Sequence, residues 1–168
     1  GGKQPAMLPM NLEGATYAEM QQLEGLIDKE VGQLDGILHN AGVLGQLTPL
    51  EMYDVDTFAE VMKVNFTATF MLTQALLPLL KDADHGSIVF TSSTVGTHPR
   101  AFWGAYALSK QAVEGMSDIF TQETQNTTNL RFNCVNPGGT RTNMRAHAYP
   151  GENPMSLKTP EDIMAGYV

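Results

Sequence analysis

A tyrosine and a lysine four residues apart, Tyr106 and Lys110, are the side chains of this sequence whose types and spacing most clearly permit chemistry. In a helix, a spacing of four places both on one face, one turn apart. A phenol with its ordinary pKa of about 10 is a poor acid or base at neutral pH, and a neighbouring ammonium lowers that pKa. Ser93 precedes the tyrosine at the end of a strand-like run. These residues predict a proton-transfer site; an ordinary surface pair on a helix is the alternative.

Composition excludes several classes of function. The chain has 168 residues, 42% of them apolar and 17% charged, which is typical of one globular domain with a real core. A net charge of −8 without a Lys/Arg cluster argues against nucleic acid and anionic membranes as partners. The single cysteine, Cys134, excludes an internal disulfide framework and fits a reducing compartment, so we expect a cytoplasmic protein. The four histidines lack metal-ligand spacing, and no metal is expected.

Strand-like and helical patterns alternate along the chain, which is typical of a parallel α/β sheet with right-handed crossovers. We expect Asp56 to cap the second helix and Pro78 to bend or end it. The predicted elements are an apolar run at 6–10 as the first strand, a helix from the Thr16 capping box to about Val31, a strand at 34–39, a helix at 56–80, a strand at 87–92, a helix at 106–124 and a strand at 130–135.

Informative residues follow three of the predicted strands. Asn40–Gly42 comes after one strand, Ser92–Ser93 after the next and Pro137–Gly138 after the last. Ligands of parallel α/β sheets bind beyond the carboxyl ends of the strands, so we expect these loops to meet at one site. The segment 140–159 is irregular and long enough to suggest a functional lid, and a last helix should begin at Thr159.

In their order and spacing, these motifs resemble the short-chain dehydrogenase/reductase family, in its single-domain Rossmann-fold branch. The runs Gly104–Tyr106 and Asn136–Thr142 further resemble a bacterial branch, the YciK-type oxidoreductases. The matching positions are the turn His39-Asn40-Ala41-Gly42, which is similar to the family's N-N-A-G, Asn65 within Lys63-Val64-Asn65, Ser93, the Y-x-x-x-K of Tyr106 and Lys110, and the segment from Pro137 to Thr142.

The resemblance implies hydride transfer between NAD or NADP and a carbonyl or alcohol substrate. Tyr106 would be the general acid or base, Lys110 would lower its pKa and bind the nicotinamide ribose, and Ser93 would hold the substrate oxygen. Asn65 would link Lys110 to solvent through its helix backbone and a water; a buried residue that caps a neighbouring strand is the alternative. The cofactor contacts that the resemblance implies are Asn11, near the adenine, and Asn40, Ala41, Gly42, Tyr106, Lys110, Pro137, Gly138, Thr140 and Thr142.

Two further expectations concern the substrate and the assembly. Arg100, Phe102, Trp103 and Met144 could line a substrate pocket, although Trp103 could instead pack at a subunit interface, and Thr140 and Thr142 could be ordinary caps. The family pairs its subunits through the two long helices, here 56–80 and 106–124. The resemblance therefore implies a homodimer or a tetramer.

The chain departs from the family pattern at its start. It has no T-G-x-x-x-G-x-G turn, which in the family lays the cofactor pyrophosphate on a helix N-terminus. We therefore expect residues 1–168 to form one partial domain of a three-layer, doubly wound Rossmann-type sheet that lacks the first two strands with their glycine-rich loop and the last strand. An inactive fragment or paralogue that retains only the oligomer interface is an alternative. A sugar-nucleotide epimerase shares the Tyr and Lys, but the Asn65 position argues against it.

Overall fold

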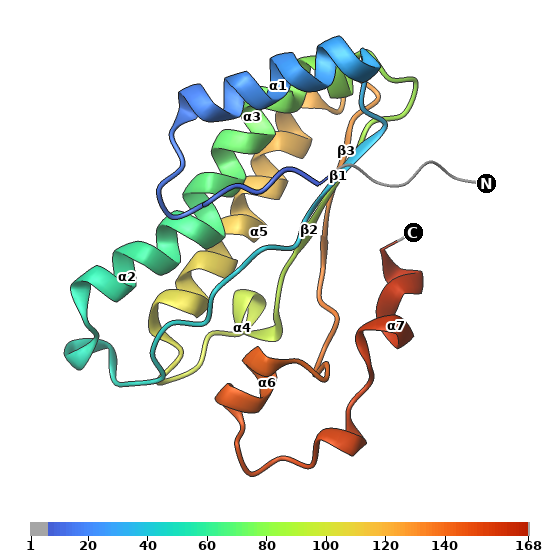
Figure 1. Cartoon of the computed structure of the whole chain (residues 1–168). Coiled ribbons are helices and arrows are strands. Elements are labelled where there is room, and N and C mark those ends of the chain that lie inside the picture. The colour runs from blue at the N-terminus through green and yellow to red at the C-terminus, as the bar shows by residue number, and fades with distance from the viewer. Residues whose placement is uncertain (1–6, 168) are drawn as a thin grey trace.

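Three parallel strands form the sheet, in the order β1-β2-β3. The computed structural model describes residues 7–167. The strands are β1 (Gly36–His39), β2 (Ser87–Thr91) and β3 (Arg131–Val135). The register pairs Gly36 with Ser87 and Ser87 with Arg131, so the three strands start level and their carboxyl ends meet at one edge. In Figure 1 this edge faces α4 and α6.

The predicted first strand at 6–10 is wrong for the part that the structure describes. Residues 7–10 have no regular secondary structure, and residue 6 lies outside the described residues. A strand needs a hydrogen-bonded neighbour, and among residues 7–167 β1 pairs with β2 alone, which leaves this segment without a partner. Met10 packs instead beside the buried Met20 of the first helix.

The first helix, α1 (Tyr17–Val31), has the bounds that its sequence signals predict. The Thr16 hydroxyl accepts the Glu19 N–H, and the Glu19 carboxylate accepts the Thr16 N–H at 2.7 Å, which completes the capping box. Gly32 ends the helix with a φ of 79°, a left-handed conformation that favours glycine.

The second predicted helix has three parts: α2 (Val55–Met62), a π-helical turn at Lys63–Thr67, and α3 (Ala68–Lys81). Its cap is Asp54 and not Asp56, because the Asp54 carboxylate accepts the Thr57 N–H at 2.8 Å. Pro78 does not end the helix, because a proline this close to the last turn removes only a hydrogen bond near the end.

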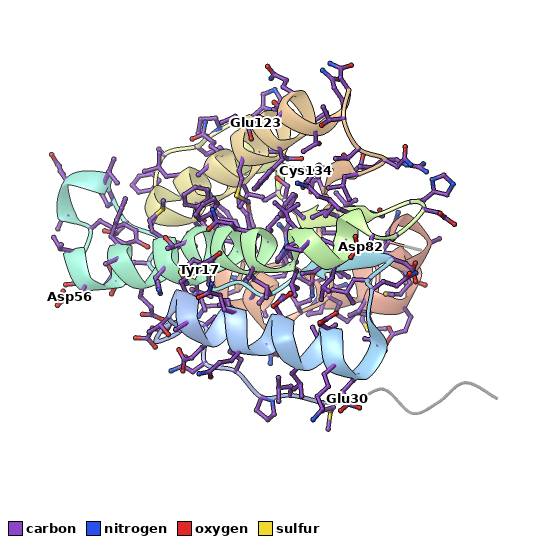
Figure 2. All side chains as sticks on the ribbon, turned by 90° about the horizontal axis from the view of Figure 1, so that it is seen from above. Tyr17, Glu30, Asp56, Asp82, Glu123 and Cys134 are labelled. Carbon is purple, nitrogen blue, oxygen red and sulfur yellow. The ribbon has the colours of Figure 1, made fainter. Side chains whose placement is uncertain are left out.

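The third long helix, α5 (Gly104–Thr124), begins two residues before the predicted start. Helices α1, α3 and α5 lie side by side, with α3 in the middle, and cover one face of the sheet (Figures 1 and 2). Alternate strand residues such as Ile88, Phe90 and Phe132 point into this layer. The main core consists of Leu76, Leu79, Leu80, Ile88, Phe90, Val113, Met116, Leu130 and Phe132.

The segment 140–159, predicted as irregular, contains a short helix, α6 (Asn143–Ala148), and a 3-10 turn at Pro154–Ser156. It is followed by α7 (Pro160–Ile163), which begins as predicted with a Thr159 capping box and proline at the first position. The other short elements are α4 (Thr94–Thr97) and 3-10 turns at Leu50–Met52 and Met164–Gly166. Among the described residues, no helix combines the length and apolar character that crossing a membrane requires. The arrangement is a Rossmann-type α/β fold, as predicted.

Candidate functional site

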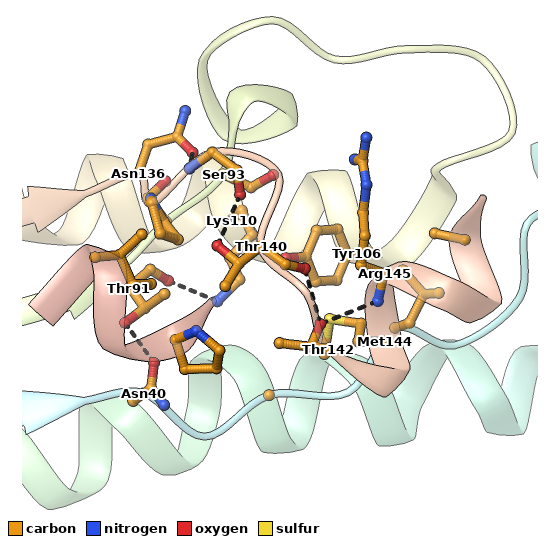
Figure 3. A pocket seen from close by; sticks show the side chains of 18 of the residues that line it. Asn40, Thr91, Ser93, Tyr106, Lys110, Asn136, Thr140, Thr142, Met144 and Arg145 are labelled. Carbon is orange, nitrogen blue, oxygen red and sulfur yellow. Dashed lines mark hydrogen bonds between the residues drawn. The ribbon is translucent and has the colours of Figure 1, made fainter. Parts of the chain in front are cut away.

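A cavity of about 370 Å³ lies at the carboxyl ends of the strands, between them and the 140–167 segment (Figure 3). The loops predicted to converge do meet here. The lining residues from the predicted site are Asn40, Gly42, Ser93, Trp103, Tyr106, Lys110, Pro137, Gly138, Thr140, Thr142 and Met144.

Tyr106 is positioned by the first turn of α5 and is only 9% exposed. Ser93 follows β2 and caps α4, where its hydroxyl accepts the Val95 N–H. Burial raises the pKa of Tyr106, and a hydrogen bond with the Ser93 side chain opposes this shift. The Ser93 side chain thus acts on the phenol, but the pKa of Tyr106 is raised and not lowered.

The position of Lys110 explains why this residue does not lower the pKa of Tyr106. Its ammonium donates to the Thr91 carbonyl oxygen at 2.7 Å and lies 5.7 Å from the centroid of the Tyr106 ring. It is bound to the strand end and makes no hydrogen bond with the phenolic oxygen, so burial decides the pKa shift at Tyr106. Burial also lowers the pKa of Lys110 to about 8, because the charged form loses its water.

Thr91, which was not among the predicted site residues, connects the ends of β1 and β2. Its hydroxyl donates to the Asn40 side-chain oxygen at 2.9 Å, and its carbonyl accepts from Lys110 (Figure 3). The available signal was its place as the last residue of β2, directly before Ser92–Ser93.

Asn65 lies in the π-helical turn and is 2% exposed. Its amide donates to the Val43 carbonyl at 2.9 Å and to the Ser109 hydroxyl at 3.0 Å, and its oxygen accepts the Val43 N–H at 2.8 Å. The side chain thus fixes the loop after β1, which is the structural role foreseen as an alternative. A Cβ at Gly42 would lie 3.4 Å from the Asn65 oxygen, so glycine lets this loop pass close by.

A second, very small cavity of about 10 Å³ lies between Asn65, Lys110 and Ala41. This volume is about that needed for one water molecule. Ala41 lines this small cavity, whereas its neighbours Asn40 and Gly42 line the large one.

The loop after β3 brings Gly138 and the two threonines to the cavity. Gly138 has a φ of 74°, and the space that a Cβ would occupy is open. Thr142 caps α6 by accepting the Arg145 N–H at 3.1 Å, so it is a helix cap and also lines the cavity.

Three predicted residues lie elsewhere. Asn11 and Arg100 are exposed and outside the cavity. Phe102 is 57% exposed and adopts a φ of 73° in the turn before α5, so its ring also lies outside, while the next residue, Trp103, lines the cavity.

The 140–159 side contributes a group of side chains that sequence patterns did not indicate. Arg145 donates two hydrogen bonds to Glu152, each 2.7 Å long, and its guanidinium lies 3.8 Å from the centroid of the Tyr149 ring. The ring of Trp103 lies between those of Tyr149 and Tyr106, at centroid distances of 5.8 and 5.9 Å. The helical spacing of Arg145 and Tyr149 was the available signal.

Comparisons with known proteins point to one family of proteins. Residues 2–153 match the family model for short chain dehydrogenase. The oxidoreductase YciK of Escherichia coli K12 is 53% identical over 167 residues, a match that covers 99% of this chain and 66% of YciK. The chain thus spans slightly less than two thirds of the length of that relative.

Solved structures give the same result. The crystal structure of a short chain dehydrogenase from Salmonella enterica serovar Typhi CT18 has a TM-score of 0.96 at 53% identity, covering 98% of this chain and 68% of that one. A short chain dehydrogenase from Escherichia coli CFT073, complexed with NADPH, has a TM-score of 0.95 at 53% identity, with the same coverage. These coverages are consistent with the incomplete sheet predicted from the sequence.

Proposed function

Because this chain belongs to the short-chain dehydrogenase family, we propose that the full protein transfers a hydride between a nicotinamide dinucleotide and a carbonyl or alcohol substrate. The observation that carries the proposal is the convergence of Ser93, Tyr106 and Lys110 on one cavity at the strand ends. The activity is assigned to the whole protein, since the chain spans 66% of the length of YciK.

The cavity residues fit the nicotinamide end of such a cofactor. The open space at Gly138 and the small volume of the cavity suit a flat ring with its ribose. We assign the contacts to Asn40, Thr140 and Lys110, which offer an amide, a hydroxyl and an ammonium. When bound, the cofactor supplies or accepts the hydride. The relative from E. coli CFT073 was solved with NADPH, so NADP is the form to test first.

Tyr106 is the proposed general acid in reduction and general base in oxidation. Its hydroxyl, buried beside Ser93, would give a proton to the carbonyl oxygen as that oxygen gains charge. The hydrogen bond with Ser93 favours the ionised phenol, so Ser93 both supports this transfer and can orient the substrate oxygen.

Lys110 is the proposed supplier of positive charge and of the replacement proton. A pKa of about 8 allows it to lose and regain a proton near neutral pH. The small cavity beside it supports the predicted relay, since one water there would lie between Lys110 and Asn65. Asn65 would take part as a positioning residue, because its side chain is already bound to Val43.

The alternative of an inactive fragment or paralogue is not favoured, because all four family side chains are present and three share the main cavity. For the assembly, we propose a homodimer or tetramer through α2–α3 and α5, where Phe70, Leu108 and Ile119 remain between 38% and 57% exposed. Only monomer in light scattering at micromolar concentration would contradict this.

The test of the function uses the full-length protein and oxidation of NADPH or NADH with a panel of aldehydes and ketones. Tyr106→Phe should lower turnover by about 10²–10⁴-fold while cofactor binding persists, because only the transferable proton is lost. Tyr17→Phe, which removes a hydroxyl from the exposed start of α1, is the matched control and should leave turnover unchanged. Undiminished turnover in Tyr106→Phe would remove Tyr106 from this role.

A further inference from the structure

One wall of the cavity is aromatic. The Trp103 ring is tilted by 53° to Tyr106 and by 41° to Tyr149, at spacings typical of packed aromatic pairs. Leu44, Met144 and Ala148 extend this wall with apolar surface. A flat apolar group placed here would lie beside the rings of Trp103 and Tyr106.

The backbone holds the Trp103 ring in place at some cost. Phe102, directly before it, has a φ of 73°, a strained conformation that is rare for a bulky residue. The Trp103 N–H donates to the Arg100 carbonyl at 3.3 Å to close this turn. Trp103 is therefore fixed one helical turn before Tyr106, on the rigid element that carries the reacting hydroxyl.

The positively charged side chains that line the cavity are already bound to other groups of the protein. Among the described residues that line the cavity, Lys110 and Arg145 carry a positive charge, and no lining residue is an aspartate or a glutamate. Lys110 donates to the Thr91 carbonyl, and the Arg145 guanidinium is held by both oxygens of Glu152. This pairing raises the pKa of Arg145 and lowers that of Glu152, so both charges persist at neutral pH.

We propose that the substrate site takes an uncharged carbonyl compound with an aromatic or flat apolar body, and that Glu152 sets this preference by occupying Arg145. The proposal rests on the function proposed above. A carboxylate or phosphate in this position would lose water without gaining a free cation, which is unfavourable. An uncharged ring would instead gain contact with Trp103 and displace water from apolar surface.

The first test compares two aldehydes that differ by one charge, benzaldehyde and 4-carboxybenzaldehyde, as substrates of the full-length protein. The wild type should prefer the uncharged aldehyde in kcat/KM by about tenfold or more. Glu152→Gln keeps the shape of the side chain but weakens its bond to Arg145. It should therefore raise kcat/KM for 4-carboxybenzaldehyde several-fold and reduce the ratio of kcat/KM between benzaldehyde and 4-carboxybenzaldehyde. Glu161→Gln, which removes an exposed charge from α7, should leave the ratio unchanged. A wild-type preference for the carboxylate, or equal ratios in the two variants, would overturn the proposal.

The second test measures binding without turnover, in the full-length Tyr106→Phe protein. Benzyl alcohol and 4-(hydroxymethyl)benzoate are each added while tryptophan fluorescence is measured. The contribution of Trp103 is identified as the part of the signal that is lost in a Trp103→Phe variant. Tighter binding of the uncharged alcohol supports the proposed substrate preference even if no aldehyde is turned over. The absence of turnover would contradict only the proposed function. Binding of neither compound, or tighter binding of the carboxylate, overturns the proposed substrate preference whatever the turnover.

Discussion

The two sides of the cavity are held in place by different kinds of contact. On the strand-end side, Tyr106, Lys110 and Asn65 are each less than a tenth exposed, and the last two bind backbone groups of neighbouring segments. On the 140–159 side, Arg145 and Glu152 are each 28% exposed and bind mainly to one another. The groups proposed for the chemistry are thus fixed by the sheet and α5. The groups proposed for substrate choice are held by a few contacts that are partly exposed to solvent.

The difference suggests how such a site can change its substrate. Arg145 and Glu152 can be replaced at small cost to the fold, because their side chains bind mainly to one another. The same replacement at the strand ends leaves buried polar groups without partners. Substitutions on the two sides should therefore differ in size and in kind.

The largest effect is expected for Lys110→Met in the full-length protein. The change removes the buried cation and leaves the Thr91 carbonyl without its donor. Turnover should fall by about 10²–10⁴-fold, as for other proton-transfer groups. Lys29→Met, on the exposed last turn of α1, is the control. A steady-state rate within tenfold of the wild type would show that the strand end does not need this charge.

Asn65→Ala should give the next largest effect, on stability. It leaves the Val43 N–H and the Val43 carbonyl without their partner, and the Ser109 hydroxyl keeps only its bond to the Tyr106 carbonyl. We expect the free energy of unfolding to fall by about 3 kcal/mol in urea titrations. Asn126→Ala, in an exposed turn, should cost little. Similar losses in both variants would mean that the loop after β1 does not depend on this clamp.

His39 provides a pH-dependent test of burial at the strand ends. It stacks on Phe90, and its ring nitrogen lies 2.9 Å from the Thr73 hydroxyl. Burial lowers the pKa of His39 to about 4, whereas the unfolded chain has a value of about 6.5. Between these values the unfolded state binds the proton and the folded state does not, so stability is lost as pH falls from about 6.5 to about 4.

The expected loss is about 2–3 kcal/mol relative to a His39→Asn variant, which cannot titrate in this range. The free energy of unfolding is measured in urea at several pH values. His85→Asn, which replaces an exposed histidine, should keep the full pH dependence of the wild type. An unchanged dependence in His39→Asn would place the acid-sensitive group elsewhere.

Local signals explain why much of the strand-end side was predictable from the sequence. Capping residues, apolar periodicity and the turns after each strand depend on neighbours in the chain, and these gave α1, the three strands and the meeting of Ser93, Tyr106 and Lys110. The parallel topology then requires the strand ends to share an edge.

The failures came from contacts that sequence spacing does not encode. Burial raises the pKa of Tyr106, and Lys110 donates to the Thr91 carbonyl, a partner 19 positions away, and not to the phenol. The prediction of a first strand is wrong at residues 7–10, because a strand needs a hydrogen-bonded neighbour as well as an apolar pattern. The pair of Arg145 and Glu152 lies in a segment without periodicity, where charge alone does not identify a partner.

The smallest effect is expected for the ion pair on the 140–159 side. A double-mutant cycle of Arg145→Met and Glu152→Gln in the full-length protein should give a coupling of about two- to fivefold in the folding equilibrium constant. The contact is bidentate but reaches solvent, so 1 M NaCl should reduce the coupling further. A coupling free energy that is as large as the loss of unfolding free energy in Asn65→Ala, and that does not change with salt, would show that both sides of the cavity are held equally firmly. The predicted small value would instead leave this side free to change its substrate without loss of the fold.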